Sequence, residues 1–291
     1  MSSPFHKLIT GTFIIVGKEP DGDSVRFVAD DLDQLFELRN GHRIRPTKSD
    51  GSVQLRFEGV DAPELHYGKD AQPLGREARD ELLGWMGFEN IQFDGNRVTA
   101  ADPAEGIRGA ILSKAAEANG RPVSWVFVEG SVPAGADGDW VRLTEAVLRD
   151  TMNHRLLETG FAYYTVYTST PLRSALRALA EAARDDGAGV WAVDSTDQFV
   201  LEDQSSIDPD GALILPKLFR RATDFLKDVA KGAFDGNLDE WLIWKSRGSR
   251  SENDKVVLPN RTQVPLSALI DQRNRTIFFQ ADILDIVFVE K

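Results

Sequence analysis

The stretch VQLRFEGVDAPELH, residues 53–66, combines a planar cation with two closely spaced carboxylates. Arg56 stands in an apolar run with the alternation of a β-strand, and Asp61 and Glu64 follow on either side of Pro63. Because the proline restricts its own backbone and that of the residue before it, the two carboxylates are presented at defined positions after the strand. Arginine binds phosphate through its planar fork, and a carboxylate can take a proton from water. The stretch therefore indicates chemistry on a phosphodiester.

A second acidic stretch and a second arginine extend this interpretation. PDGDS places Asp21 and Asp23 around a glycine, just before another strand. Asp23 and Asp61 offer the hard oxygen ligands that Ca²⁺ prefers. Arg121, in NGRPVSWVFV, follows a turn and opens a strand, so it can share the charge that develops on the equatorial phosphate oxygens. Taken singly, PDGDS is an ordinary turn and Arg56 a solvated strand arginine. Only the combination indicates phosphodiester hydrolysis.

Short strands must hold these residues. The segments ITGTFIIVG, SVRFVA, VQLRFEGV, IQFDG and PVSWVFVEG are separated by Gly, Pro, Asp and Asn, which predicts a small antiparallel sheet or barrel. Apolar spacing predicts helices over residues 76–86, 151–158 and 170–187, the last with Thr170 as its cap and Gly187 as its stop. GIRGAILSKAAEA also has a helical pattern.

The composition changes after VWAVD. The Ser-, Asp- and Gln-rich segment STDQFVLEDQSSIDPDG predicts a linker over residues 195–212. Beyond it we expect a helix over residues 214–231, then apolar runs, and two short strands with a helix start in VLPNRTQVPLSALI. The predicted organisation is a catalytic domain at residues 8–194 and a small C-terminal α+β domain of unknown type at residues 213–291.

The overall composition limits the classes of function. The chain has 291 residues, 42% of them hydrophobic, which is enough for a buried core, and it has no cysteine for disulfides or thiolate metal sites. Its net charge of −12 argues against a broad electrostatic grip on nucleic acid. The sequence has no phosphate-binding glycine loop and no nucleophile elbow, which argues against kinase-like, ATPase and serine-hydrolase chemistry. No two histidines have the spacing of metal ligands.

Neither a membrane span nor an export signal is visible in the sequence. No apolar run approaches the roughly 18 residues of a spanning helix. The opening MSSPFHKLITGTFIIVG lacks a basic start and a small-residue cleavage site. We therefore expect a cytoplasmic protein with no membrane partner.

Six motifs occur in one order: DGDS, LRFEGVDAPE, QPLGREA, GRPVSWVFV, MNHRLLETGFAYY and GVWA. In this order the chain resembles the staphylococcal-nuclease-like (thermonuclease) domain over residues 8–194. The resemblance implies an OB-type five-stranded β-barrel with packed helices. It also implies a Ca²⁺-dependent nuclease that hydrolyses DNA or RNA to 3′-phosphate and 5′-hydroxyl products.

The resemblance gives a role to individual positions. Two arginines that stabilise the transition state and a general base correspond to Arg56, Arg121 and Glu64. The metal ligands correspond to Asp23, Asp61 and, through its backbone carbonyl, Ala62. Family members also hold the nucleotide with tyrosines. Tyr164 and Tyr167 are the nearby candidates, for which packing in the core or surface is an equal alternative.

Three long segments depart from the family pattern: DDLDQLFELRNGHRIRPTKSD, the segment containing GIRGAILSKAAEA, and SVPAGADGDWVRLTEA. We expect at least the second to lie near the catalytic face. The alternative to an enzyme is a non-catalytic nucleic-acid-binding or scaffold protein on the same fold. The presence of Arg56, Glu64 and Arg121 together favours the enzyme, because folding does not require these three residues.

The predicted helix over residues 214–231 carries a basic set: Lys217, Arg220, Arg221, Lys227 and Lys231. These side chains could dock a protein partner or recruit substrate, and the alternative is a solvated helix face.

Overall fold

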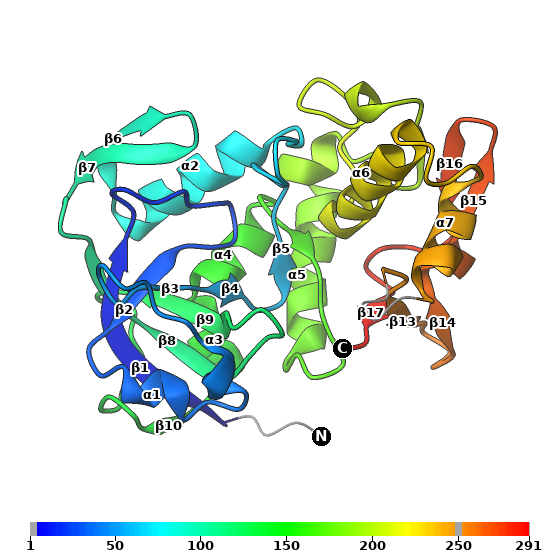
Figure 1. Cartoon of the computed structure of the whole chain (residues 1–291). Helices are drawn as coiled ribbons and strands as arrows, with labels where there is room; N and C mark the ends of the chain where they lie inside the picture. Colours follow the sequence, from blue (N-terminus) through cyan, green and yellow to red (C-terminus); the bar gives the residue numbers. More distant parts are fainter. Residues whose placement is uncertain (1–4, 248–251, 291) are drawn as a thin grey trace.

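The computed structural model describes residues 5–247 and 252–290. Residues 248–251 and 291 of the predicted C-terminal domain, and the first four residues of the chain, lie outside the described residues. The chain forms a mixed α+β structure: a curved sheet on one side, a group of helices in the middle and a smaller α+β unit on the other side (Figure 1). The predicted α+β class is therefore confirmed.

The main sheet is barrel-like and nearly closed. Its strands follow the order β3-β2-β1-β8-β9-β4, and β10 pairs with the far end of β1. The bounds are Phe5–Ile14 (β1), Arg26–Ala29 (β2), Val53–Gln54 (β3), Arg56–Phe57 (β4), Ile107–Ala116 (β8), Pro122–Val128 (β9) and Trp140–Arg142 (β10).

One continuous segment joins the two ends of this sheet. Strands β3 and β4, at opposite ends of the order, are separated only by Leu55. The backbone N–H of Leu55 donates to Val25 O at 3.0 Å on the β2 side, and that of Glu58 donates to Ser124 O at 3.0 Å on the β9 side. Residues 53–58 therefore bring the first and last strands together. The assignment to an OB-type barrel of five strands stays a prediction. In the part of the chain that the structure describes, the sheet contains seven strands, one of which, β10, lies in the third long segment.

Large apolar side chains fill the inside of the sheet. Among the fully buried residues are Phe13, Phe27, Phe57, Trp125 and Phe127, contributed by four different strands and all inaccessible to solvent or nearly so. Burial of aromatic side chains of this size is a main source of stability in such a core. The sheet that carries Arg56 is thus anchored from within.

The helical prediction for GIRGAILSKAAEA is wrong. This segment forms β8, which pairs with β1 on one side and β9 on the other. Consecutive residues Ile111 and Leu112 are both fully buried, as in a central strand covered on both faces. Packing thus overrides the helix propensity of its alanines and lysine.

Three helices support the sheet and confirm the sequence predictions: α2 (Gly75–Met86), α4 (Met152–Glu158) and α5 (Arg173–Asp185). Two helices are short: α1 (Asp33–Phe36) lies in the first long segment, and α3 (Glu145–Arg149) begins at the end of the third. Thr170 does not cap α5, because Leu172 occupies the cap position and the Thr170 hydroxyl instead donates to the buried Glu58 carboxylate.

Two strand pairs complete this part of the chain. Strand β5 (Val60–Asp61) pairs with β11 (Tyr163–Tyr164), and β6 (Glu89–Asp94) forms a hairpin with β7 (Arg97–Asp102).

The C-terminal part contains α6 (Pro216–Ala230), α7 (Leu238–Lys245) and two small antiparallel sheets. One sheet has the order β12-β16-β15, with bounds Gln198–Val200, Thr276–Phe279 and Ile270–Arg273. The other has the order β14-β13-β17, with bounds Gln263–Pro265, Lys255–Val257 and Val287–Phe288. Short 3₁₀ turns lie at Gly41–Arg43, Gly189–Ala192, Gln204–Ser206 and Leu266–Leu269.

The two parts of the chain interlock. Tyr163 and Val190 pack in the C-terminal core, although both precede the predicted linker. The backbone of Phe288 donates to Val166 O and accepts from Thr168 N, both at 2.9 Å. The segment predicted as a linker contains β12, a strand of the C-terminal unit. The division at residues 195–212 stays a prediction.

Within residues 5–247 and 252–290, no helix has the length and apolar character that crossing a membrane requires.

Candidate functional site

The PDGDS turn packs directly on the second acidic stretch. Gly22 permits this approach, because a Cβ built there would lie 2.7 Å from the Ala62 Cβ and 2.9 Å from the Ala78 Cβ. Asp23 Oδ2 accepts a hydrogen bond from the Ala62 backbone N–H at 3.3 Å. The structure therefore brings together the two acidic stretches that the sequence identified.

The start of α2 holds the backbone of Glu64. The Gln72 side-chain oxygen accepts from Glu64 N at 3.1 Å, and Gln72 N donates to Glu64 O at 2.8 Å. Gly75, the first residue of α2, lies so close to the Glu64 backbone that a Cβ built on it would be 2.9 Å from Glu64 O. The QPLG sequence thus fixes where the Glu64 carboxylate leaves the backbone.

A buried asparagine fixes the segment between Arg56 and Asp61. Asn153 on α4 is fully buried, and its side chain donates to Glu58 O at 2.9 Å and to Ser124 O at 3.0 Å. Its oxygen accepts from Val126 N at 2.9 Å. Sequence reasoning gave this residue no role, although an asparagine in an apolar helix pattern is a signal of a satisfied buried amide.

The acidic side chains repel one another. Burial, followed by the charge of Glu64, raises the pKa of Asp21 to about 7. Burial and the charges of Asp61 and Asp21 raise the pKa of Asp23 to about 8. Burial and mutual repulsion therefore both favour the protonated forms of Asp21 and Asp23.

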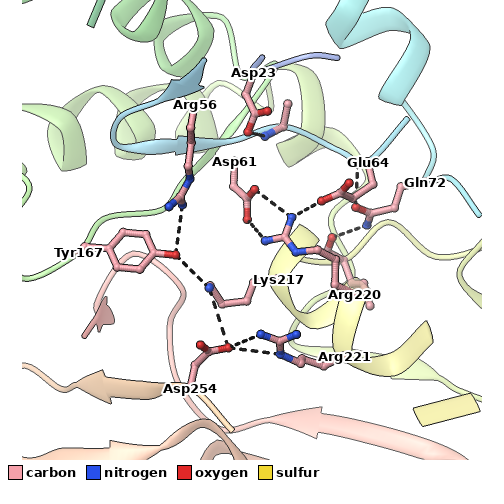
Figure 2. Close-up of polar contacts among 12 residues, drawn as sticks. Asp23, Arg56, Asp61, Glu64, Gln72, Tyr167, Lys217, Arg220, Arg221 and Asp254 are labelled. Atoms are coloured by element: carbon pink, nitrogen blue, oxygen red, sulfur yellow. Dashed lines mark hydrogen bonds and ion pairs between the residues drawn. The ribbon is translucent and has the colours of Figure 1, made fainter. Parts of the chain in front are cut away.

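Arg56 projects from β4 into this region and contacts a tyrosine. Its Nη2 donates to the Tyr167 hydroxyl at 3.1 Å, and its guanidinium lies 4.8 Å from the centre of the Tyr167 ring (Figure 2). Lys217 Nζ donates to the same hydroxyl at 3.0 Å. Although burial acts to raise it, the two cations lower the pKa of Tyr167 to about 8. Tyr167 thus holds Arg56 and Lys217 together.

Arg121 and Tyr164 have partners other than Arg56 and the two acidic stretches. Arg121 precedes β9, which runs parallel to β4 with Val123 opposite Arg56. Its Nε donates to Glu117 at 3.2 Å, and its side chain is 38% exposed. Its charge opposes the rise in the Asp23 pKa. Tyr164 is buried, and its hydroxyl donates to a backbone carbonyl at 3.4 Å. The roles predicted for both residues stay predictions.

Arg220, from α6, reaches the centre of the candidate site, and sequence reasoning gave it no role there. Its Nη2 donates to Asp61 Oδ2 at 2.8 Å and its Nη1 to Asp61 Oδ1 at 3.2 Å, while Nη1 also pairs with Glu64 Oε1 (Figure 2). Although burial acts to raise it, contact with Arg220 holds the pKa of Asp61 below its usual value. The guanidinium therefore bridges the predicted metal ligand and the predicted base.

The neighbouring basic residues of α6 are also engaged. Lys217 contacts Tyr167, and Arg221 donates to Asp254 through Nη2 at 2.9 Å. The Lys217, Arg220 and Arg221 side chains are 8%, 21% and 13% exposed. A fully solvated basic face is therefore excluded for this part of α6.

The donor chemistry and the donor geometry disagree about a metal ion. Carboxylate oxygens suit Ca²⁺, yet both Asp61 oxygens are bonded to Arg220. Among the residues that the structure describes, no three His, Cys, Asp or Glu side chains are grouped so that they could hold a metal ion. In this arrangement the side chains do not fit a calcium site.

The fold and site together define a mixed α+β protein with an acid–arginine cluster beside a barrel-like sheet. No family model matches the chain. A stretch of 38 residues is 47% identical to a protein named probable endonuclease lcl3 from Aspergillus niger. This match spans 13% of the chain and 14% of that protein, so the chain covers only a small part of that protein's length.

Proposed function

We propose that the chain is a nuclease that hydrolyses phosphodiester bonds in DNA or RNA at the cluster around Glu64. The proposal rests on one observation: the two acidic stretches and Arg56 meet at one place, with Asp23 bonded to the Ala62 backbone and Arg56 beside the same loop. The short match to a protein named as a probable endonuclease supports it.

Each side chain would have one task. Glu64 accepts a proton from the attacking water, which makes the oxygen a better nucleophile. Arg56 and Arg121 neutralise charge on the equatorial phosphate oxygens as the water attacks in line with the leaving 5′ oxygen. Tyr167 holds the Arg56 guanidinium through a hydrogen bond and through its ring. The resulting products would carry 3′-phosphate and 5′-hydroxyl ends.

Calcium dependence is part of the proposal and comes from the resemblance. Asp23, Asp61 and the Ala62 carbonyl are the expected ligands, although Asp61 is bonded to Arg220 here. None of the steps above is routed through a metal ion.

The test compares Glu64→Gln with the unaltered protein on labelled single-stranded DNA, duplex DNA and RNA, with Ca²⁺ and with EDTA. The substitution removes the proton acceptor and keeps the volume, so cleavage should fall by roughly 10²- to 10⁴-fold. Glu81→Gln, on the exposed face of α2, is the matched control and should cleave normally. Equal rates for the unaltered protein and Glu64→Gln would remove Glu64 from the mechanism.

The pairing of Arg220 with Asp61 and Glu64 favours a second candidate, a non-catalytic nucleic-acid-binding protein on this fold. Binding of labelled nucleic acid without cleavage, in both metal conditions, would select it.

A further inference from the structure

Helix α6 brings a second cation to Arg56. In its first turn, Lys217 reaches the hydroxyl of Tyr167, which also binds Arg56 (Figure 2). Lys217 Nζ and Arg56 Nη2 each lie about 3 Å from that oxygen, so the two cationic nitrogens are within about 6 Å of each other. Like charges at this separation repel each other, and an anion placed between them would be attracted to both.

Neither cation has a close carboxylate partner. Among the residues that the structure describes, Arg56 forms no ion pair with a carboxylate, and Lys217 pairs only with Asp254 Oδ2, at 3.9 Å. Arg221 Nη2 lies nearer to that same oxygen, at 2.9 Å. The charges of Arg56 and Lys217 are therefore incompletely neutralised by the chain itself.

The other inner cations of α6 are paired more tightly. Both oxygens of Asp61 accept from Arg220, and Lys227 Nζ lies 2.9 Å from Asp70 Oδ2. The charge of Asp61 also acts on Lys217, but its oxygens are bonded to Arg220. Ion pairing thus accounts for the position of Arg220 and Lys227 and does not account for that of Lys217.

The surroundings of Lys217 favour negative charge at one point. Its side chain is 8% exposed, and its ammonium lies 4.6 Å from the centre of the Phe288 ring. Although burial acts to raise it, Arg56 and Lys217 lower the pKa of Tyr167 to about 8. No described residue accepts a hydrogen bond from the Tyr167 hydroxyl, which accepts from both cations. Its hydrogen is therefore available to an anion at the same place.

We propose that Lys217 is a phosphate-binding residue of the candidate site, so that Arg56 and Lys217 together bind one phosphoryl group of the substrate beside the Tyr167 hydroxyl. This inference rests on the proposed nuclease function and adds a substrate contact from the C-terminal part of the chain. The guanidinium donates through its planar fork, the ammonium donates as a compact point charge, and the phenol donates its one hydrogen. The site is complete only when α6 is in place.

The experiment measures binding of a labelled single-stranded DNA, and of RNA with the same sequence, to the full chain by fluorescence anisotropy. It is done in EDTA at several KCl concentrations, and every protein carries Glu64→Gln so that the strand is not cut. Adding Lys217→Gln should weaken binding by about 10- to 100-fold, the loss expected for one charge-assisted hydrogen bond. The slope of log K against log salt should become shallower by about 0.7, because one phosphate contact is lost.

Two further variants separate a phosphate contact from a structural role. Lys231→Gln is the matched control, because it removes the same charge from the exposed end of the same helix, and it should keep the affinity and the slope. Lys217→Arg keeps the charge and should restore the slope. Weaker binding by Lys217→Gln with an unchanged slope would mean that Lys217 only supports the fold, and it would overturn the proposal.

A second measurement keeps the test decisive if Lys217→Gln fails to fold by circular dichroism. It follows the phenolate absorbance of Tyr167 in the Glu64→Gln protein as pH rises, with and without an oligonucleotide of deoxyadenosine. A phosphate bound by the two cations offsets their charge, so the oligonucleotide should move the titration of Tyr167 from near pH 8 toward its ordinary pKa. An unchanged titration with the oligonucleotide bound would overturn the proposal.

The two proposals fail in different ways. Cleavage by Lys217→Gln at the rate of the unaltered protein, with Glu64→Gln inactive, would retain the nuclease and overturn the phosphate contact. No cleavage by any protein, with the losses of affinity and slope seen for Lys217→Gln, would overturn the nuclease and retain the phosphate contact. No binding of either DNA or RNA would overturn both.

Discussion

Replacing the buried Asn153 by alanine should destabilise the fold strongly. Its side chain makes three hydrogen bonds to backbone groups, at 2.9, 2.9 and 3.0 Å. The Ser124 carbonyl keeps a second bond, from Glu58 N, but the Val126 N–H and the Glu58 carbonyl lose the bonds that the amide made. Each buried group left unsatisfied costs about 1–3 kcal/mol, so we expect a loss of about 2–6 kcal/mol in the free energy of unfolding.

Urea unfolding followed by tryptophan fluorescence measures this loss. Asn260→Ala is the control, because Asn260 is exposed and its side chain accepts a bond from the nearby Thr262 N–H, so its cost should stay within about 0.5 kcal/mol. Asn153→Asp adds a second check. It keeps the acceptor for Val126 N–H but turns a negative oxygen toward the Glu58 and Ser124 carbonyls, so it should also lower the free energy of unfolding. A free energy for Asn153→Ala within about 1 kcal/mol of the unaltered protein would refute the reasoning, which rests on the cost of unpaired buried groups.

Three further predictions concern titration and packing. Tyr167 should ionise near pH 8 instead of near its usual pKa of 10.0, and its phenolate absorbance should be abolished by Tyr167→Phe. The free energy of unfolding should rise between pH 8 and pH 10, because the tyrosine of the unfolded chain still binds its proton there. A phenolate titration near pH 10 contradicts this. Because the pKa of Asp23 is raised, its contribution to stability falls as pH rises from about 4 to about 8. At pH 8, Asp23→Asn should therefore unfold at a higher urea concentration than the unaltered protein. An equal or lower urea midpoint would show that the charge of Asp23 does not destabilise the turn. Phe288→Ala, at a buried position where the two parts of the chain meet, should cost about 3–5 kcal/mol and lower the midpoint of a single transition; two separate transitions would show that the parts unfold independently.

The parts of the site that sequence reasoning predicted are those fixed by local chemistry. Pro63 and the PDGDS turn restrict the backbone over a few residues, so the meeting of Asp23 with the Ala62 segment follows from short-range constraints and one close approach at Gly22. The helices with clear apolar spacing were predicted for the same reason. Their apolar residues recur at the spacing of successive helical turns, so each buried face can be predicted from neighbouring residues.

Long-range packing accounts for what sequence reasoning missed. Arg220 lies 159 positions after Asp61, and nothing near it in the sequence distinguishes a solvated arginine from one that binds two carboxylates. The composition of β8 suits a helix, whereas its pairing on both sides and its burial on both faces decide its structure. Hydroxyl residues often cap helices, but the Thr170 hydroxyl donates to the buried Glu58 carboxylate instead.

The interlocking of the two parts has a consequence for the order of events during translation. The ribosome makes Asp61 and Glu64 long before Arg220, and it makes Phe288, whose backbone bonds to residues 166 and 168, after every element that holds α6. Because nascent chains fold from the N-terminus, the barrel-like sheet must tolerate two carboxylates without their cation while the rest is synthesised. A nascent chain that stops before residue 216 would present this acidic cluster without α6.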